Sequence, residues 1–312
     1  MKKPTLSVIL ASYNYSKYIK SAICAIVQQS YEPLELIIIE DASTDNSLDI
    51  LLEETKGLSY VKIMVHAKNQ GILYVMNEGF SLAKGDFVYY AAADDIICPG
   101  LFEKSMNLLQ KHPTTGVFCS NMGAFFQNNP SIFQEYPIKT PSKEFPKKEY
   151  FFSPNEVEIL FQKTKLAIHG QCCIYNRPLI IQHGGFSSNL LALTDWYLAH
   201  KIALHQGMAY IPELLVLSRM NSQTYSAKAF RISKRHALNK KILQAIESES
   251  PVFQRKVKKS CLLIQLGIPM LISLLISPRY WNFLPSLLKK KCKNIHHKIT
   301  HIFSHRHTLQ NR

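Results

Sequence analysis

Several common sequence features are missing from this chain of 312 residues. No phosphate-binding loop of the GxGxxG or GxxxxGK(S/T) type follows the first apolar run, so the two commonest Gly-rich nucleotide sites are not expected. The seven cysteines have no paired CxxC spacing, and no zinc ribbon is predicted. No internal repeat is visible, which argues against a solenoid or propeller.

Long apolar runs are also missing. A membrane-spanning helix needs about 20 apolar residues, whereas Cys261–Ile276 has sixteen and contains Gln, Gly and Pro. The run Leu6–Ala11 near the N-terminus is too short for a secretory signal, and we interpret it as a first strand. The odd, scattered cysteines then predict reduced thiols and a cytoplasmic setting.

Acidic residues are absent after Glu249, which concentrates the net charge of +15 near the C-terminus. Of the 37 Lys and Arg, 12 follow Glu249, and the other 25 nearly balance 22 acids. Basic residues flank Cys261–Ile276, and Ser286–Phe303 mixes Leu and Ile with lysines. This pattern favours a helical region on an anionic membrane surface. The alternatives are helices packed on the rest of the protein, or a solvated basic tail.

Strand-like apolar runs alternate with helical patterns along the first 120 residues. The expected strands are Leu6–Leu10, Leu34–Ile39, Val61–Val65, Phe87–Ala92 and Val117–Ser120. Apolar residues at helical spacing lie between them, at Tyr18–Gln29, near Leu48–Leu52, at Ile72–Ala83 and at Leu101–Gln110. Such alternation predicts an α/β fold with a mainly parallel sheet.

Polar residues follow the first four expected strands. They are Ser12-Tyr13-Asn14, Glu40-Asp41, Lys68-Asn69 and Asp94-Asp95. Ligands of parallel α/β sheets bind beyond the carboxyl ends of the strands. A nucleotide bound there without a phosphate loop needs a cation for its diphosphate, and paired carboxylates suit Mg²⁺ or Mn²⁺. The alternative for Asp94-Asp95 is turn and helix-cap chemistry.

Four stretches in the same order resemble the inverting family 2 glycosyltransferases of the GT-A fold. They are "LSVILASYNYSKYIKSAICAIVQQSY", "LELIIIEDASTDNSLDIL", "KNQGILYVMNEGFSLAKGDFVYYAAADD" and "GGFSSNLLALTDWYLAHKIALHQGMAYIPELLVLSRMNSQTYS". The resemblance covers about residues 5 to 225. It implies a GT-A type nucleotide-binding domain over residues 1–225 with a mainly parallel central sheet, followed by a basic helical C-terminal appendage over 226–312.

The resemblance also implies roles for single residues. Asp41 corresponds to the acid that hydrogen-bonds the base, usually uracil, and Asp195 to the catalytic base. Asp94 and Asp95 correspond to the acidic motif that holds ribose, diphosphate and Mn²⁺ or Mg²⁺. The implied nucleotide-binding residues are Ala11, Ser12, Tyr13, Asp41, Asn69, Gly71 and Asp94. In transfer with inversion, a carboxylate takes the acceptor's proton on one side of the sugar, and a cation offsets diphosphate charge on the other.

Alternatives and departures accompany these assignments. Asp41 and Asp195 are also suited to cap the helices that follow them. Three positions depart from the family pattern, namely Ala92, Met76 and Thr194, where acidic, Arg and Glu residues are often found. Arg219 matches a basic family position beside phosphate, or forms a surface ion pair. We expect Trp196, Leu198 and Ile202 to pack inward behind Asp195.

The expected function is therefore an enzyme, a non-processive glycosyltransferase. It would move a sugar from a UDP-sugar to a hydroxyl of a glycan or lipid-linked acceptor, with inversion, in cell-surface polysaccharide synthesis. The expected location is peripheral, on the cytoplasmic face of a membrane with an anionic surface. A processive synthase is disfavoured because no QxxRW motif is present. The alternatives are a catalytically weakened GT-A scaffold and a basic nucleic-acid binder; the second is disfavoured because the basic residues flank an apolar run, and no nucleic-acid partner is expected.

Overall fold

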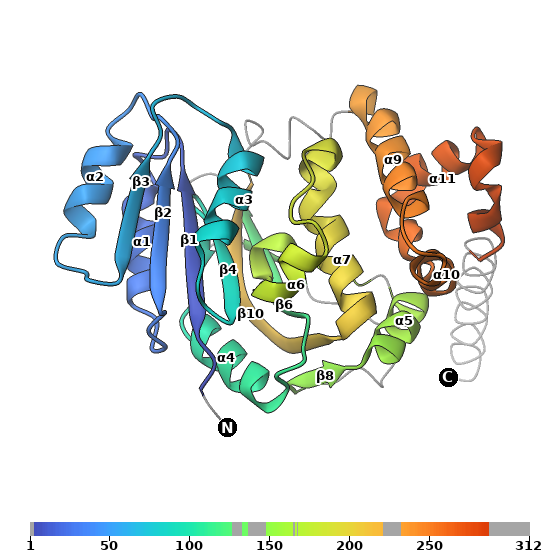
Figure 1. The fold of residues 1–312 in the computed structure, drawn as a ribbon, viewed down its shortest axis with the longest axis horizontal. Coiled ribbons are helices and arrows are strands. Elements are labelled where there is room, and N and C mark those ends of the chain that lie inside the picture. Colours follow the sequence, from blue (N-terminus) through green and yellow to red (C-terminus); the bar gives the residue numbers. More distant parts are fainter. Residues whose placement is uncertain are drawn as a thin grey trace, which may run out of the picture.

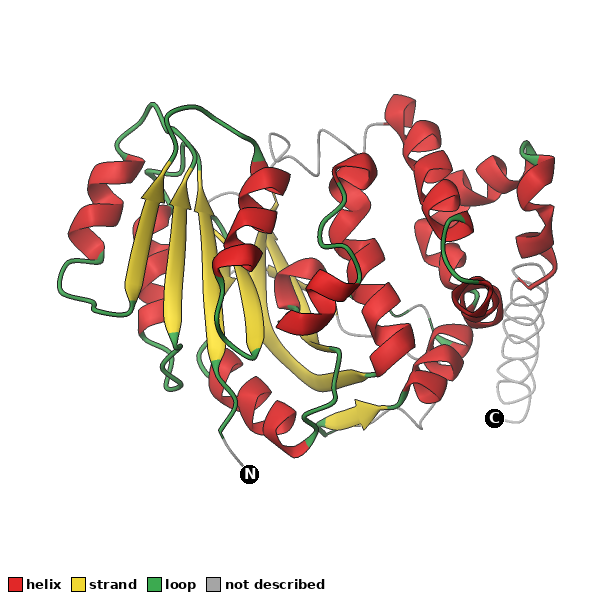
Figure 2. Ribbon diagram, in the orientation of Figure 1, coloured by secondary structure: helices red, strands yellow, loops and turns green. Residues whose placement is uncertain are grey.

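The protein is built around one mixed β-sheet with helices on both faces (Figure 1). The computed structural model describes residues 3–126, 133–136, 148–164, 166, 168–220 and 232–286. The sheet has ten strands in these ranges. Figure 2 shows the first three strands of the chain ending side by side at one edge of the sheet, with the loops that follow them on that side.

Six strands of the sheet point the same way, which confirms the predicted α/β class with a mainly parallel sheet. The parallel strands are β1 (Leu6–Ser12), β2 (Glu35–Glu40), β3 (Val61–Val65), β4 (Phe87–Ala92), β6 (Val117–Phe126) and β10 (Met208–Met220). The others are β5 (Ile96–Ile97), β7 (Phe133–Tyr136), β8 (Tyr150–Phe152) and β9 (Ile174–Asn176). The strand order is β3-β2-β1-β4-β9-β6-β10-β5, with β7 beside β6 and β8 beside β10.

Helices cover the two faces because side chains along β1 alternate between two hydrophobic clusters. Leu6, Val8 and Leu10 lie in one cluster, and Ile9 and Ala11 lie in the other. The first cluster is covered by α1 (Ile19–Val27), α2 (Ser47–Glu54) and α4 (Leu101–Lys111). The second is covered by α3 (Ile72–Leu82), α5 (Pro154–Lys163), α6 (Arg177–Gln182) and α7 (Thr194–Gln206).

The C-terminal helices extend the second cluster beyond α7 (Figure 1). They are α9 (Ile232–Glu247), α10 (Pro251–Ser260), the 3₁₀ helix η3 (Leu262–Leu266), α11 (Gly267–Leu275) and η4 (Pro278–Phe283). Phe253 of α10 is fully buried and stacks on His205 of α7, with ring centroids 5.3 Å apart. The Trp196 indole of α7 donates to Gln265 Oε1 of η3 at 3.2 Å. The described part of the basic region therefore packs against the sheet and its helices.

The apolar run Cys261–Ile276 does not form one helix. Cys261 has a left-handed backbone with φ of 55° and separates α10 from η3 and α11. In the described ranges no single helix is long and apolar enough to cross a membrane, although α10 together with Leu262–Leu275 meets that length and composition as a pair bent by 60°. The predicted amphipathic stretch Ser286–Phe303 lies outside the described residues after its first residue.

We expect Phe253→Ala to lower the free energy of unfolding by about 3–5 kcal/mol, because it removes a fully buried aromatic ring. The matched control is Val252→Ala in the same helix, where the side chain is half exposed and the change should stay within about 0.5 kcal/mol. Denaturant unfolding followed by tryptophan fluorescence and circular dichroism measures both. Equal small effects would show that the C-terminal helices add little to the stability of the core.

Candidate functional site

Hydrogen bonds between side chains and backbone fix the loop after β1 against the loop after β2. Asn14 has φ of 59°, a conformation that Asn tolerates better than most residues. Its Oδ1 accepts the N–H of Thr44 at 2.8 Å, and its own N–H donates to Ser43 Oγ at 2.9 Å. The N–H of Tyr15 donates to Ser47 Oγ at 2.9 Å. These bonds hold the end of β1 in place beside β2.

Two buried hydroxyls at or near the ends of β1 and β4 have no hydrogen-bond partner among the described residues. They are Ser12 Oγ and Tyr90 Oη. Ala11 and Ser12 are buried, whereas Tyr13 is 43% exposed. Because an unpaired buried polar atom costs about 1–3 kcal/mol, orphaned hydroxyls of this kind indicate a place for a polar ligand. The predicted residues Ala11, Ser12 and Tyr13 thus line one side of a candidate ligand site.

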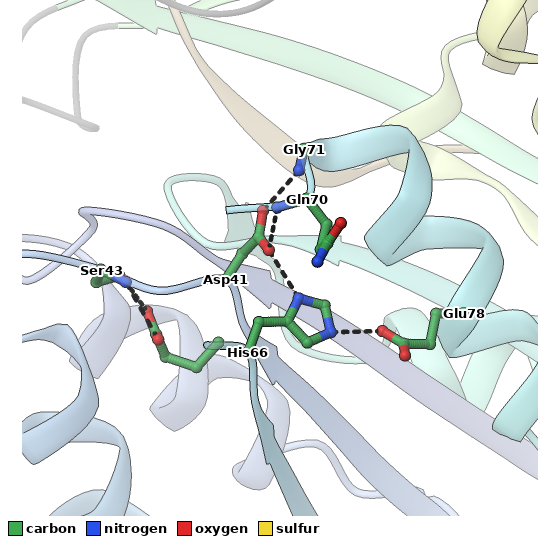
Figure 3. Close-up of polar contacts among 7 residues, drawn as sticks. Asp41, Ser43, His66, Gln70, Gly71 and Glu78 are labelled. Atoms are coloured by element: carbon green, nitrogen blue, oxygen red, sulfur yellow. Dashed lines mark hydrogen bonds and ion pairs between the residues drawn. The ribbon is translucent and has the colours of Figure 1, made fainter. Parts of the chain in front are cut away.

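Asp41, directly after β2, holds the loop that precedes α3 (Figure 3). Its Oδ1 accepts the N–H of Gln70 at 2.8 Å and lies 2.7 Å from Nδ1 of His66. Its Oδ2 accepts the N–H of Gly71 at 2.9 Å. Gly71 has φ of 88°, which favours glycine at the start of α3. Asp41 therefore does not cap α2, the helix that follows it in sequence.

The Asp41 carboxylate keeps one acceptor position for a ligand. A carboxylate offers about four lone-pair positions, and the three groups above occupy three of them. Asn69 lies on the same loop and is exposed. The structure thus brings Asp41, Asn69 and Gly71 together, as the sequence predicts, and Asp41 and Gly71 are in direct contact.

His66 and Glu78 complete this cluster, although the sequence analysis did not single them out. His66 Nε2 lies 2.8 Å from Glu78 Oε2 of α3, so the imidazole sits between two carboxylates (Figure 3). The hydrogen bond to Asp41, followed by that to Glu78, raises the pKa of His66 above its usual value despite partial burial. The sequence offers one signal for His66, its position at the end of a strand, because it directly follows β3 just as Asp41 follows β2.

Asp94 and Asp95 form the turn between β4 and β5 and face Arg219 of β10. Asp95 is 7% exposed, and its Oδ1 accepts the N–H of Arg219 at 2.9 Å. Burial, with the neighbouring Asp94 adding to it, raises the pKa of Asp95 to about 7. Burial also raises the pKa of Asp94. Gly100, and neither aspartate, occupies the N-cap of α4, so helix capping does not explain the acidic pair.

Arg219 brings a positive charge to this turn. Its Nε donates to the backbone carbonyl of Asp94 at 3.2 Å. Its guanidinium lies over the rings of Tyr18 and Phe125, 4.1 Å and 4.5 Å from their centroids. Stacking on two rings fixes the guanidinium plane. A basic group is thus held beside the acidic pair.

The acidic pair fits a divalent cation shared with a ligand. In the part of the chain that the structure describes, no three His, Cys, Asp or Glu side chains gather as a metal cage. Asp94 and Asp95 supply hard carboxylate oxygens, which Mg²⁺ and Mn²⁺ prefer. Their raised pKa values show that the positive charge around them does not offset the cost of burial. A cation held by both carboxylates would need its other ligands from diphosphate oxygens and water.

Asp195 lies in the first turn of α7, and Leu193 occupies the N-cap. Its Oδ1 accepts the N–H of Trp196 at 2.8 Å, and burial raises its pKa. A Cβ atom on Gly170 would lie 2.4 Å from Oδ2, so only glycine allows this approach. As predicted, the side chains behind Asp195 are buried; they are Trp196, Leu198 and Ile202.

The short segment Gly170–Cys173, which leads into β9, lies near both acid sites. Burial, Cys173 and Asp95 raise the pKa of the Cys172 thiol, whereas burial and Asp195 raise that of Cys173. The adjacent thiols belong to different hydrophobic clusters, Cys172 to the first and Cys173 to the second. Tyr89 of β4 donates to the carbonyl of Gln171 at 2.9 Å and fixes this segment against the sheet. Asp95 and Asp195, far apart in sequence, thus border the same element.

Comparison with known proteins identifies the chain. A family model described as glycosyl transferase family 2 matches residues 7–183. The chain belongs to this family. Its sequence is 29% identical over 183 residues to a putative glycosyltransferase, EpsH, of Bacillus subtilis, covering 59% of this chain and 50% of EpsH. It is 35% identical over 113 residues to an uncharacterized glycosyltransferase of Haemophilus influenzae, covering 36% of this chain and 45% of that protein. The matches span about a third to a half of several such relatives.

Solved structures show the same fold. TarS 1–349 of S. aureus in complex with UDP-GlcNAc superposes with a TM-score of 0.62 at 17% identity, covering 84% of this family 2 chain and 72% of TarS 1–349. The mannosyltransferase PcManGT of Pyrobaculum calidifontis, in complex with GDP-Man and Mn²⁺, gives 0.56 at 18% identity, covering 95% and 88%. The predicted GT-A fold and family resemblance are confirmed.

The departures from the family pattern have structural counterparts. Met76 is buried in the hydrophobic cluster beneath α3. The adjacent Asn77 exchanges two hydrogen bonds with the backbone of Phe186, at 2.8 and 2.9 Å, and ties α3 to the loop after α6. Thr194 Oγ1 is buried without a partner among the described residues, next to Asp195.

Proposed function

We propose that this glycosyltransferase moves a sugar from a UDP-sugar to a hydroxyl of a glycan or lipid-linked acceptor, with inversion, in cell-surface polysaccharide synthesis. The observation that carries the proposal is the placement of two acid sites near one short segment, with Asp195 packed against Gly170 and Asp95 close enough to Cys172 to raise the pKa of its thiol. Inverting transfer needs a leaving-group site and a base on opposite sides of the sugar.

The cluster around Asp41 favours uridine as the donor base. Its carboxylate has one acceptor position left, and uracil presents a single N–H donor on its pairing edge, whereas guanine presents two adjacent donor groups. Ser12 Oγ and the exposed ring of Tyr13 lie at the neighbouring strand end. The binding of UDP-GlcNAc by the structural neighbour TarS supports a uridine nucleotide.

Different residues would accept the proton of the acceptor and stabilise the departing diphosphate. Asp195 accepts the proton of the attacking hydroxyl, and its raised pKa brings the carboxyl closer to the range where bases work at neutral pH. Asp94 and Asp95 would hold Mn²⁺ or Mg²⁺, which when bound offsets the negative charge of the departing diphosphate. The guanidinium of Arg219, fixed by two rings, faces the same turn and adds positive charge.

We expect UDP to bind more tightly than GDP, ADP or CDP, and more tightly with Mn²⁺ than with a chelator. Asp95→Ala should remove the metal enhancement, since it deletes one of two carboxylates at the site. Asp49→Ala, which removes a carboxylate from α2, serves as the control and should keep it. Isothermal calorimetry measures each pair. Equal affinity with Mn²⁺ and with chelator would exclude the metal role, and no binding of any nucleoside diphosphate would support a scaffold.

Asp195→Asn should lower transfer about 10²- to 10⁴-fold while UDP binding stays normal. Asn keeps the size of the side chain and an oxygen for the Trp196 N–H, but it cannot take a proton. The turnover of a UDP-sugar with a competent acceptor measures the effect, and a thermal melt serves as the folding control. Near wild-type turnover would exclude Asp195 as the base and direct attention to the other acids of the site.

The proposed location is the cytoplasmic face of an anionic membrane, and α11 offers the contact surface. Its inner face, including Met270 and Leu274, is buried in the protein. Its outer face and the residues after it carry apolar side chains that are all more than half exposed, namely Ile268, Ile272, Leu275, Ile276 and Trp281. Such a stripe beside an acid-free basic segment suits an anionic bilayer surface.

The double variant Ile272→Glu, Trp281→Glu should bind anionic vesicles at least about tenfold more weakly, because it places charge where apolar area would be buried. Ile181→Glu, at an equally exposed isoleucine of α6, is the matched control and should bind as the wild type does. Sedimentation with phosphatidylserine-containing vesicles at two salt concentrations measures binding. Unchanged binding of the double variant would exclude this face, and preference of the intact chain for oligonucleotides would favour the nucleic-acid alternative.

A further inference from the structure

The His66 imidazole joins three separate elements through its two ring nitrogens. Nδ1 lies 2.7 Å from Asp41 Oδ1 at the end of β2, and Nε2 lies 2.8 Å from Glu78 Oε2 on α3. His66 itself directly follows β3, and its backbone N–H donates to the carbonyl of Glu40 at 2.9 Å. The three side chains are only 11%, 4% and 21% exposed for His66, Asp41 and Glu78.

Only the protonated imidazole satisfies both carboxylates. A neutral imidazole has one N–H, so one of its nitrogens would present a lone pair to a carboxylate oxygen at hydrogen-bond distance. The charged groups that face the ring are Asp41 and Glu78, and the ring of Tyr74 from α3 lies edge-on at 5.9 Å. The two carboxylates raise the pKa of His66, so the protonated form persists to higher pH than in an isolated histidine.

We propose that His66 is a positioning residue that couples its own protonation to the binding of the donor nucleoside, by fixing the Asp41 carboxylate and the loop 66–71. The proposal rests on the proposed function, in which Asp41 receives the base. Asp41 also accepts the N–H groups of Gln70 and Gly71. Any shift of its carboxylate therefore moves the loop that leads into α3.

The direction of the pH dependence follows from the raised pKa. The interaction is complete below the ordinary histidine pKa of about 6.5 and is lost as pH rises through the higher value of the folded protein. Loss of the proton leaves two carboxylates with no cation between them, which also disfavours an anionic donor. Donor binding should thus be strongest at mildly acidic to neutral pH and weaken at alkaline pH.

The experiment measures the affinity for UDP by calorimetry between pH 6 and pH 9 in the wild type and two variants. Glu78→Gln removes one carboxylate, so the pH at which binding weakens should move down. His66→Asn keeps a donor for Asp41 but cannot be charged, so its affinity should lack this transition and resemble the weaker, alkaline form of the wild type, about five- to tenfold below the acidic form. Ionisation of UDP itself affects the wild type and both variants equally. Differences between their pH profiles therefore report on the cluster of Asp41, His66 and Glu78.

Two controls separate this coupling from general effects on folding. Glu213→Gln removes a surface carboxylate that pairs with Lys104, and His236→Asn removes a histidine that contacts Ser273. Both should keep the wild-type pH profile, and thermal melts at each pH follow stability. If His66→Asn does not fold, the shift in Glu78→Gln decides the question.

The outcomes distinguish the inference from the proposed function. If UDP binds but Glu78→Gln leaves the pH profile unchanged, the coupling is wrong and the glycosyltransferase assignment stands. If the wild type binds no nucleoside diphosphate at any pH, both are wrong. A downward shift in Glu78→Gln with unchanged controls supports the role of His66.

Discussion

The pairing of β1 with β2 on one side and β4 on the other determines where Asp41 and the Asp94-Asp95 pair of the proposed nucleotide site lie. The register places Ser12 beside Glu40 and Ala11 beside Ala92. Asp41 and the Asp94-Asp95 turn therefore leave the sheet at the same height, around the end of β1. The backbone N–H of Asp41 extends this pairing by donating to the Ser12 carbonyl at 2.8 Å. A shift by one residue would turn these side chains to the opposite face of the sheet.

The protein gathers several acids at one edge and offsets their charge in different ways. Asp41 is held by two backbone N–H groups and by His66, which together occupy three of its four acceptor positions. Asp94 and Asp95 are less well compensated, and burial keeps their pKa values high. Asp195 has a backbone N–H donor and a close glycine, and burial raises its pKa. The carboxylates with fewer partners are those proposed to meet a cation or a proton, whereas the one with three partners is proposed to recognise a base.

The sequence was informative where the signal is local. The five long apolar runs predicted β1, β2, β3, β4 and β6, because buried parallel strands are nearly continuous in apolar residues. Strands of two or three residues, such as β5 and β8, leave no periodic signal. β10 was also missed, since Pro212 and Glu213 interrupt its apolar pattern where the register shifts. The acid doublet Asp94-Asp95 is visible in the sequence, but the His66–Glu78 contact depends on how α3 packs beside β3 and could not be read from spacing alone.

The hydrogen bond from Trp196 to Gln265 links α7, the helix that carries Asp195, to the C-terminal helices. The family match ends at residue 183, before Asp195 and before the helices that brace its helix from behind. The residues matched by the family model thus include the strand ends around Asp41 and Asp94. Asp195 lies after the matched residues, on a helix against which the C-terminal helices pack. A shortened protein that ends with the sheet would leave the Trp196 indole without its Gln265 partner and would expose to water the apolar side chains behind Asp195.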